Sequence, residues 1–195
     1  MKIIVIENAF KSSPVEEPSV MVYPDTCLFR NNDPFYIPDL QQRTIMRAGC
    51  LIKIDKIGKC IDVQFANRYF SQVGLGFDFI QADFRNSLLT KGLDGGPAVY
   101  FDRSLAASNG CVELEHFRSL RTTYRVKFNE SELSLSEQSA RFTFDQAVSI
   151  ASQYFTLKIG DYVFVPAVSF DKGVKQGDII DGAFQNNILL RCVVK

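Results

Sequence analysis

The sequence has no net charge, a single histidine and no hydrophobic run of membrane-spanning length. Its 22 Lys and Arg residues balance 22 Asp and Glu residues, so the composition predicts neither a nucleic-acid partner nor an anionic membrane. Residues 1–7 are too short an apolar run for a signal peptide, and no window approaches a membrane span. These absences predict a protein that binds neither nucleic acid nor a membrane.

Cysteine motifs are missing as well. The chain contains five cysteines, an odd number, and no C-x-x-C pair. Widely spaced single thiols are typical of a reducing cytoplasm and disfavour a zinc site. We therefore expect a cytoplasmic protein with reduced thiols at these positions: Cys27, Cys50, Cys60, Cys111 and Cys192.

The chain does contain enough apolar material for one core. It has 195 residues, of which 46% are hydrophobic, and 17 of them are phenylalanines. A chain of this size suits one globular domain, and the sequence shows no internal repeat or low-complexity tract. We expect a single domain over residues 1–195.

The most informative stretch is residues 73–84, where a carboxylate lies inside an apolar run. Apolar residues alternate there with Gly74, Gly76 and Asp78, and this period of two predicts a strand. Two glycines in one strand indicate that something approaches the backbone closely. A carboxylate is costly to bury alone, so Asp78 is either a satisfied structural residue or a metal ligand or its remnant.

The same stretch resembles the fumarylacetoacetate hydrolase family. Residues 76–83 (GFDFIQAD) and 101–104 (FDRS) are similar to the family patterns G-x-D-x-T-A-R-D and K-G-F-D-G-S. The resemblance extends over nearly the whole chain and needs almost no gaps between residues 23 and 104. Members hydrolyse, isomerise, hydrate or decarboxylate small keto or enol acids such as acylpyruvates, usually with Mg²⁺ or Mn²⁺.

By this resemblance the fold is mainly β, of the α+β class. We expect mixed β-sheets in the family's roll or sandwich, with a few short helices. Members commonly form homodimers, so the resemblance implies a homodimer. Positions that shape the backbone match the family: Gly76, Asp78, the pair Gly160-Asp161 and the pair Gly177-Asp178.

Local patterns predict three further elements. Thr143 is a good N-cap, and the apolar spacing after it predicts a helix over residues 143–155. Residues 114–128 predict alternating strands, and the dipeptide at residues 129–130 predicts a hairpin turn.

The family's metal site is where this chain departs most. Members carry H-Y-E-x-E on the strand that corresponds to residues 45–54, and the two glutamates share one face of that strand. Here these two positions are Arg47 and Gly49. An arginine stays protonated and cannot coordinate a cation, so Asp78 is the only surviving ligand position. We expect no Mg²⁺, Mn²⁺ or other cofactor, and an ion pair between Arg47 and Asp78; the alternative is that Arg47 reaches solvent.

Substrate-binding positions are changed too. The family lysine corresponds to Val99, which cannot stabilise an oxyanion, and Lys91 imitates the motif only after a shift of eight residues. Asp102 remains, but a turn explains it equally well. A later loop of the family loses its threonines and glycines here: Ala167 is among the replacements, and Phe170 has the size to fill the pocket.

The N-terminal lid of the family is also incomplete. Members carry N-Y-x-x-H there, and its histidine and a neighbouring glutamate activate water. Residues 8–13 follow the outline without a histidine, so we expect residues 1–20 to form a shortened lid. The single histidine, His116, is expected at the surface or an edge rather than in catalysis.

Three hypotheses follow. We favour a non-catalytic relative, a pseudoenzyme that keeps the fold and binds a protein partner or a small carboxylate. The second is a divergent, metal-independent hydrolase, isomerase or decarboxylase of a small keto acid, with Arg47 holding a carboxylate and Asp78 or Asp83 as base. The third is an ordinary metal-dependent member whose ligands are misaligned. The remnant pocket of the favoured hypothesis consists of Arg47, Gly49, Asp78, Val99, Asp102 and Ala167.

Overall fold

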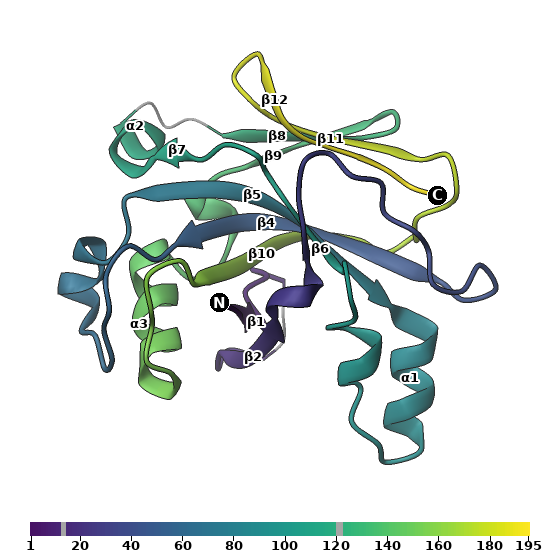
Figure 1. The fold of residues 1–195 in the computed structure, drawn as a ribbon, viewed down its shortest axis with the longest axis horizontal. Coiled ribbons are helices and arrows are strands. Elements are labelled where there is room, and N and C mark those ends of the chain that lie inside the picture. The colour runs from purple at the N-terminus through teal and green to yellow at the C-terminus, as the bar shows by residue number, and fades with distance from the viewer. Residues whose placement is uncertain (13–14, 120–122) are drawn as a thin grey trace.

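The structure is a computed structural model that describes residues 1–12, 15–119 and 123–195. Its strands form one sheet of eight strands and a second sheet of four (Figure 1). The helices are short, and the longest in the described residues has 11 residues. The expected mainly β architecture, with mixed sheets and a few short helices, is confirmed.

The large sheet runs in the order β2-β1-β10-β4-β5-β6-β3, and β7 pairs with the start of β5. It is mixed, because β1 lies parallel to β10 and β3 lies parallel to β6, whereas its other described pairs are antiparallel. Its strands are β1 (Lys2–Glu7), β2 (Ser19–Pro24), β3 (Leu28–Phe29), β4 (Thr44–Lys53), β5 (Gln72–Gln81), β6 (Leu105–Ala107), β7 (Val112–Glu113) and β10 (Tyr162–Phe170).

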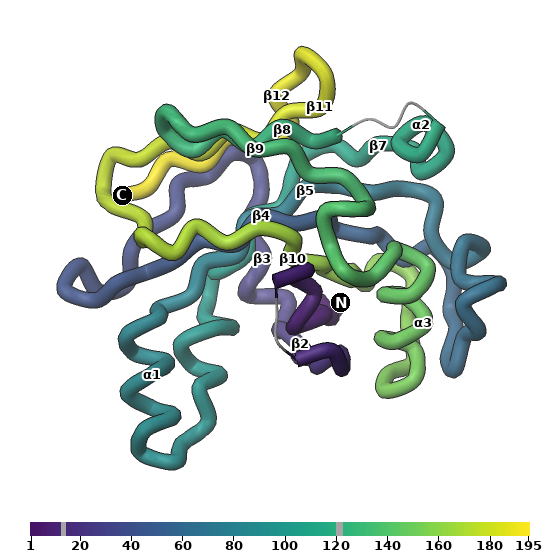
Figure 2. Tube along the Cα trace, turned by 180° about the vertical axis from the view of Figure 1, so that it is seen from behind, coloured from purple at the N-terminus to yellow at the C-terminus, as the bar shows by residue number. Residues whose placement is uncertain are grey.

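The small sheet lies over one face of the large sheet, and Figure 2 shows the same stacking from behind. It is antiparallel in the order β12-β11-β8-β9. The predicted hairpin turn joins β8 to β9, and Asn129 has a φ of 51° in it. The strands are β8 (Tyr124–Phe128), β9 (Ser131–Leu135), β11 (Ile179–Phe184) and β12 (Asn187–Val193).

The helix predicted after Thr143 is confirmed. The hydroxyl oxygen of Thr143 accepts the backbone N–H of Gln146 at 3.2 Å, and the Gln146 side chain accepts the N–H of Thr143 at 2.9 Å. The helical elements are α1 (Ala82–Thr90), α2 (Leu114–Ser119) and α3 (Phe144–Tyr154), with the 3₁₀ turns η1 (Asp25–Cys27), η2 (Val63–Arg68), η3 (Gly96–Ala98) and η4 (Glu137–Ser139).

The strand prediction for residues 114–128 is wrong in its first part, because α2 occupies it. Leu114 and Phe117 are both buried, and this spacing of three places them on one face of a helix. The second part is correct, since it contains β8. Residues 120–122 lie outside the described residues.

Two apolar clusters occupy the two faces of the large sheet, because successive side chains of a strand point to opposite faces. The cluster between the two sheets includes Met46, Phe77 and Phe79. The cluster on the opposite face includes Tyr23 and Phe164. The expected catalytic region lies on this opposite face, since the odd-numbered residues of β4 point to it.

The structure also shows the state of the cysteines and the character of the helices. All five cysteines lie in the described residues and are free. Burial raises the pKa of Cys50 to about 12, so its thiol stays protonated. No helix in the described residues is long and apolar enough to cross a membrane.

Candidate functional site

The candidate site begins with two residues that face each other across the centre of the large sheet. Arg47 on β4 is directly opposite Asp78 on β5. The Arg47 Nε donates to the Asp78 Oδ2 at 2.9 Å, and Nη2 donates to the same oxygen. The expected ion pair between Arg47 and Asp78 is therefore present, and Arg47 does not reach solvent.

Two further side chains, neither of them predicted from the sequence, complete the cluster. The Arg47 Nη1 donates to Glu7 Oε2 at 2.8 Å and Nη2 to Glu7 Oε1 at 3.0 Å, a bidentate contact. The Tyr23 hydroxyl accepts from Arg47 Nη2 at 3.2 Å and donates to Asp78 Oδ2 at 3.3 Å. We call Glu7, Tyr23, Arg47 and Asp78 the ion cluster.

A period-two signal could have found Glu7. Ile3 and Val5 point to the face that carries the ion cluster, and Glu7 is the next residue of β1 in this alternation. Of the segment expected as a shortened lid, residues 2–7 and 19–20 are in strands of the large sheet.

Three of the four residues of the ion cluster are buried, and Glu7 is partly buried. Asp78 and Tyr23 have no exposed surface, and Arg47 is 4% exposed. Burial opposes the charge of Arg47, but the carboxylates of Asp78 and Glu7 raise its pKa overall, so the guanidinium stays charged. Burial, reinforced by Asp78, raises the pKa of Tyr23, so its hydroxyl stays protonated and can donate.

The pKa values of the two carboxyl groups shift in opposite directions, although both groups contact the guanidinium of Arg47. Burial raises the pKa of Glu7, but the charge and hydrogen bonds of Arg47 outweigh it and leave the pKa lowered. Burial raises the pKa of Asp78 to about 6, although Arg47 opposes the shift. The Oδ1 of Asp78 is buried and has no hydrogen-bond partner in the described residues. This lack of a donor also favours a raised pKa, because the charged form is left without stabilisation at that oxygen.

The raised pKa of Asp78 predicts a pH effect on stability. Between the ordinary value of 3.8 and about 6, the folded chain binds the Asp78 proton more tightly than the unfolded chain does. The contribution of this group to the free energy of unfolding therefore falls as the pH rises through that window, by roughly 1–3 kcal/mol. The residue at this position does not titrate in Asp78→Asn. In urea unfolding, the free energy of unfolding of wild type minus that of the variant should therefore fall as the pH rises through this window. A difference that stays constant with pH would contradict the prediction.

The residues present do not fit a divalent metal ion. The Oδ2 of Asp78 already accepts two N–H groups of Arg47, and the guanidinium beside this carboxylate repels a cation. In the described residues, no group of three or more His, Cys, Asp or Glu side chains is placed to hold a metal ion. The second ligand position is closed as well, because a Cβ at Gly49 would lie 2.2 Å from the backbone oxygen of Val165.

The other residues of the predicted remnant pocket lie in different surroundings. Val99 follows η3 and is buried in the apolar cluster that includes Tyr23. Asp102 is exposed in a turn. Ala167 lies at a bulge of β10 and lines an open hollow of about 470 Å³ with Phe10 and Ser169.

The expectation that Phe170 fills the pocket is wrong. β10 has a bulge between Pro166 and Val168, which reverses the alternation of its side chains. Ser169 therefore lies opposite Arg47, and Phe170 lies opposite Met46 on the other face. The Phe170 ring packs edge-on against Phe128, with ring centres 5.3 Å apart.

Three other residues considered in the sequence lie apart from the ion cluster. Asp83 is at the start of α1 and pairs with Arg43 at the surface. Lys91 is exposed at the end of α1. His116 is exposed on α2, as expected, and its ring is 5.8 Å from that of Phe184.

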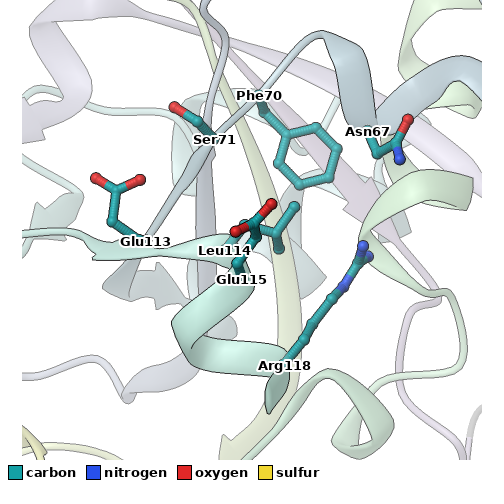
Figure 3. A pocket seen from close by; sticks show the side chains of 7 residues that line it. All are labelled: Asn67, Phe70, Ser71, Glu113, Leu114, Glu115 and Arg118. Atoms are coloured by element: carbon teal, nitrogen blue, oxygen red, sulfur yellow. The ribbon is translucent and has the colours of Figure 1, made fainter. Parts of the chain in front are cut away.

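A separate hollow of about 390 Å³ lies beside α2 (Figure 3). Glu113, Glu115 and Arg118 line it together with Phe70. Arg118 is already paired with Glu137 and Asp145. None of the residues of the ion cluster lines this hollow.

Neighbouring atoms are expected from the sequence to approach the backbone closely at Gly74 and Gly76, and they do so at Gly76. A Cβ at Gly76 would lie 2.9 Å from Leu51 Cδ1 and 3.0 Å from Phe164 Cε2. Side chains of the neighbouring strands therefore cover the backbone beside Asp78. A residue with a side chain would therefore not fit at Gly76 unless these neighbours moved.

Comparisons with known proteins support the fold alone. No family model and no curated protein matches the sequence. A protein of the fumarylacetoacetate hydrolase family from Yersinia pestis CO92 has a TM-score of 0.86 and 17% identity, covering 100% of this chain and 92% of that chain. Fumarylpyruvate hydrolase from Pseudomonas aeruginosa, solved with Mn²⁺ and pyruvate, has a TM-score of 0.78 and 16% identity, covering 100% and 89%.

A third structure is 5-carboxymethyl-2-hydroxymuconate delta-isomerase from Mycobacterium smegmatis, with a TM-score of 0.82 and 17% identity. The match covers 99% of this chain and 78% of that chain. The chain therefore has the fold of the fumarylacetoacetate hydrolase family, among whose solved structures are hydrolases and isomerases.

Proposed function

We propose that this chain, which has the fumarylacetoacetate hydrolase fold, is a non-catalytic protein that acts by binding. In this proposal the family's catalytic region has become a structural ion cluster. The observation that carries it is the Arg47 guanidinium, which contacts Asp78 and Glu7 where the family would hold a divalent ion.

The ion cluster also argues against a metal-independent enzyme at the same place. Arg47 directs its N–H groups to Glu7, Asp78 and Tyr23 and is 4% exposed, so it has no surface from which to hold a substrate carboxylate. Asp78 has no exposed surface, so a substrate proton cannot come within hydrogen-bond reach of it. Asp83 pairs with Arg43 at the surface and does not share a site with Asp78.

The substrate side of the region supports the same proposal. Val99 packs into the apolar cluster that includes Tyr23 and Phe164, so the position of the family lysine has become core. Loss of one oxyanion-stabilising donor lowers the rate by roughly 10²–10³. Here two metal-ligand positions and the lysine position are replaced together, and a rate above background would need other groups to supply both functions.

The proposal is tested by metal content and turnover of the purified chain. We expect no retained Mg²⁺ or Mn²⁺ by elemental analysis, no heat of binding with either ion, and no turnover of acylpyruvates or oxaloacetate above buffer. The Pseudomonas fumarylpyruvate hydrolase serves as the active control under the same conditions. Metal-dependent turnover would overturn the proposal in favour of a misaligned ligand set, and turnover in chelator would favour a divergent enzyme.

The binding partner belongs to the same proposal. We expect a homodimer, by analogy with the family, and either a protein partner or a small carboxylate as ligand. Oxalate and pyruvate are suitable probes, because each would raise the melting temperature if it bound the folded chain. A carboxylate that binds must do so outside the ion cluster, since the donors of Arg47 are engaged within it.

A further inference from the structure

Two loops at one side of the molecule carry the same tripeptide, Lys-Ile-Gly, at residues 56–58 and 158–160. The backbone joins them: the N–H of Gly58 donates to the Leu157 oxygen at 3.2 Å, and the N–H of Leu157 donates to the Gly58 oxygen at 2.8 Å. Figures 1 and 2 agree that the segment after β4 lies beside α3.

Both loops expose large apolar side chains. Ile57 is 61% exposed and Ile159 is 68% exposed, and Tyr154 at the end of α3 is 62% exposed. Such exposure at a turn gains nothing for the fold, since a buried isoleucine is worth more than an exposed one. Three exposed lysines surround these tips, and we call the set the Lys-Ile patch: Lys56, Ile57, Lys59, Tyr154, Lys158 and Ile159.

The three lysines of the Lys-Ile patch have no ion pair with any described residue. Two exposed acids flank the first loop, and each accepts a backbone N–H group while keeping its negative charge. Asp55 accepts the N–H of Ser71 at 2.7 Å, and Asp62 accepts the N–H of Gln64 at 3.0 Å. The three lysines outnumber these two acids, so the patch is apolar at its tips and carries a small excess of positive charge around them.

We propose that the Lys-Ile patch docks onto an anionic lipid surface, with Ile57 and Ile159 inserted among the headgroups. The lysines then lie against lipid phosphates and carboxylates, and their methylene stems add to the apolar contact. Two features favour lipid over an acidic protein. The isoleucines protrude rather than line a groove, and lysine is depleted in protein interfaces.

The test is co-sedimentation of the full chain with vesicles. We expect binding to vesicles of equal parts phosphatidylcholine and phosphatidylserine and none to phosphatidylcholine alone. Ile57→Ser with Ile159→Ser should weaken binding about tenfold for each isoleucine, and Lys56→Gln or Lys158→Gln about fivefold each. Ile188→Ser is the matched control, because Ile188 is 54% exposed on β12, and it should bind as wild type does.

Several outcomes would overturn the proposal. The intact chain could fail to bind the anionic vesicles, or the double isoleucine variant could bind as well as Ile188→Ser. Equal binding to uncharged vesicles would remove the role of the lysines. Binding to polyglutamate without binding to vesicles would assign the Lys-Ile patch to an acidic protein. Melting temperatures of all variants show whether each is folded.

Discussion

Arg47→Met is expected to lower the free energy of unfolding by about 3–5 kcal/mol. The substitution leaves the carboxylates of Glu7 and Asp78 beside each other without the guanidinium that both contact. Asp78 has no exposed surface, so water cannot replace the lost hydrogen bonds. Urea unfolding at neutral pH measures the change.

Arg43→Met is the matched control, because Arg43 is the residue just before β4 and also forms an ion pair. Arg43 pairs with Asp83 at 3.5 Å, but both side chains are about half exposed, and such pairs contribute roughly 0–1 kcal/mol. The triple variant Glu7→Gln, Arg47→Met, Asp78→Asn removes all three charges and should recover most of the lost stability. If Arg47→Met is no less stable than Arg43→Met, the ion cluster does not stabilise the fold. If the triple variant recovers nothing, unpaired charge is not the cause.

Gly49→Ala is expected to lower the free energy of unfolding by about 3 kcal/mol. The new Cβ would lie 2.2 Å from the Val165 oxygen and 2.7 Å from the Pro166 Cα. Both are backbone atoms of the neighbouring strand, so relief requires β10 to move rather than a side chain to rotate. Thermal and urea unfolding both report the loss.

Gly110→Ala is the control for Gly49→Ala. A Cβ at Gly110 would meet only Leu189 Cδ2, at 3.6 Å, which is an ordinary contact. Its effect should stay within about 0.5 kcal/mol of wild type. Equal effects of the two substitutions would show that β10 yields readily at Gly49, and a glutamate could then be restored there without unfolding the chain.

The ion pair of Arg47 with Asp78 could be predicted from the sequence. Alternation predicts the strand of Asp78, and the family resemblance implies that Arg47 lies on a strand that faces the same site. Neighbouring strands with one buried face have a strongly specified register. A guanidinium and a carboxylate facing each other away from water then form a pair.

Contacts from distant segments were not predictable in the same way. Tyr23 reaches the ion cluster because β2 pairs with β1, and Glu7 reaches it because β1 lies beside β10. The orientation of Phe170 depends on a bulge in β10, since one extra residue moves each later side chain to the opposite face. No local pattern in the sequence marks that extra residue.

The distribution of charge was likewise not predictable from the sequence alone. The whole chain is neutral, and the composition alone predicted no attraction to an anionic membrane. The Lys-Ile patch arises only when the loops at residues 56–58 and 158–160 lie together, because each loop alone has too few cations to attract a charged surface.

The amino-acid sequence by itself determined the strand that holds Asp78, the helix after Thr143 and the presence of a fixed positive charge at Arg47. These follow from side-chain periodicity and from the fixed charge of a guanidinium, both of which are local properties. Tertiary structure decided that Glu7 and Tyr23 join Arg47 and that Gly49 is closed by β10. The physical reason is that buried electrostatics and steric fit depend on atoms brought together across the sheet.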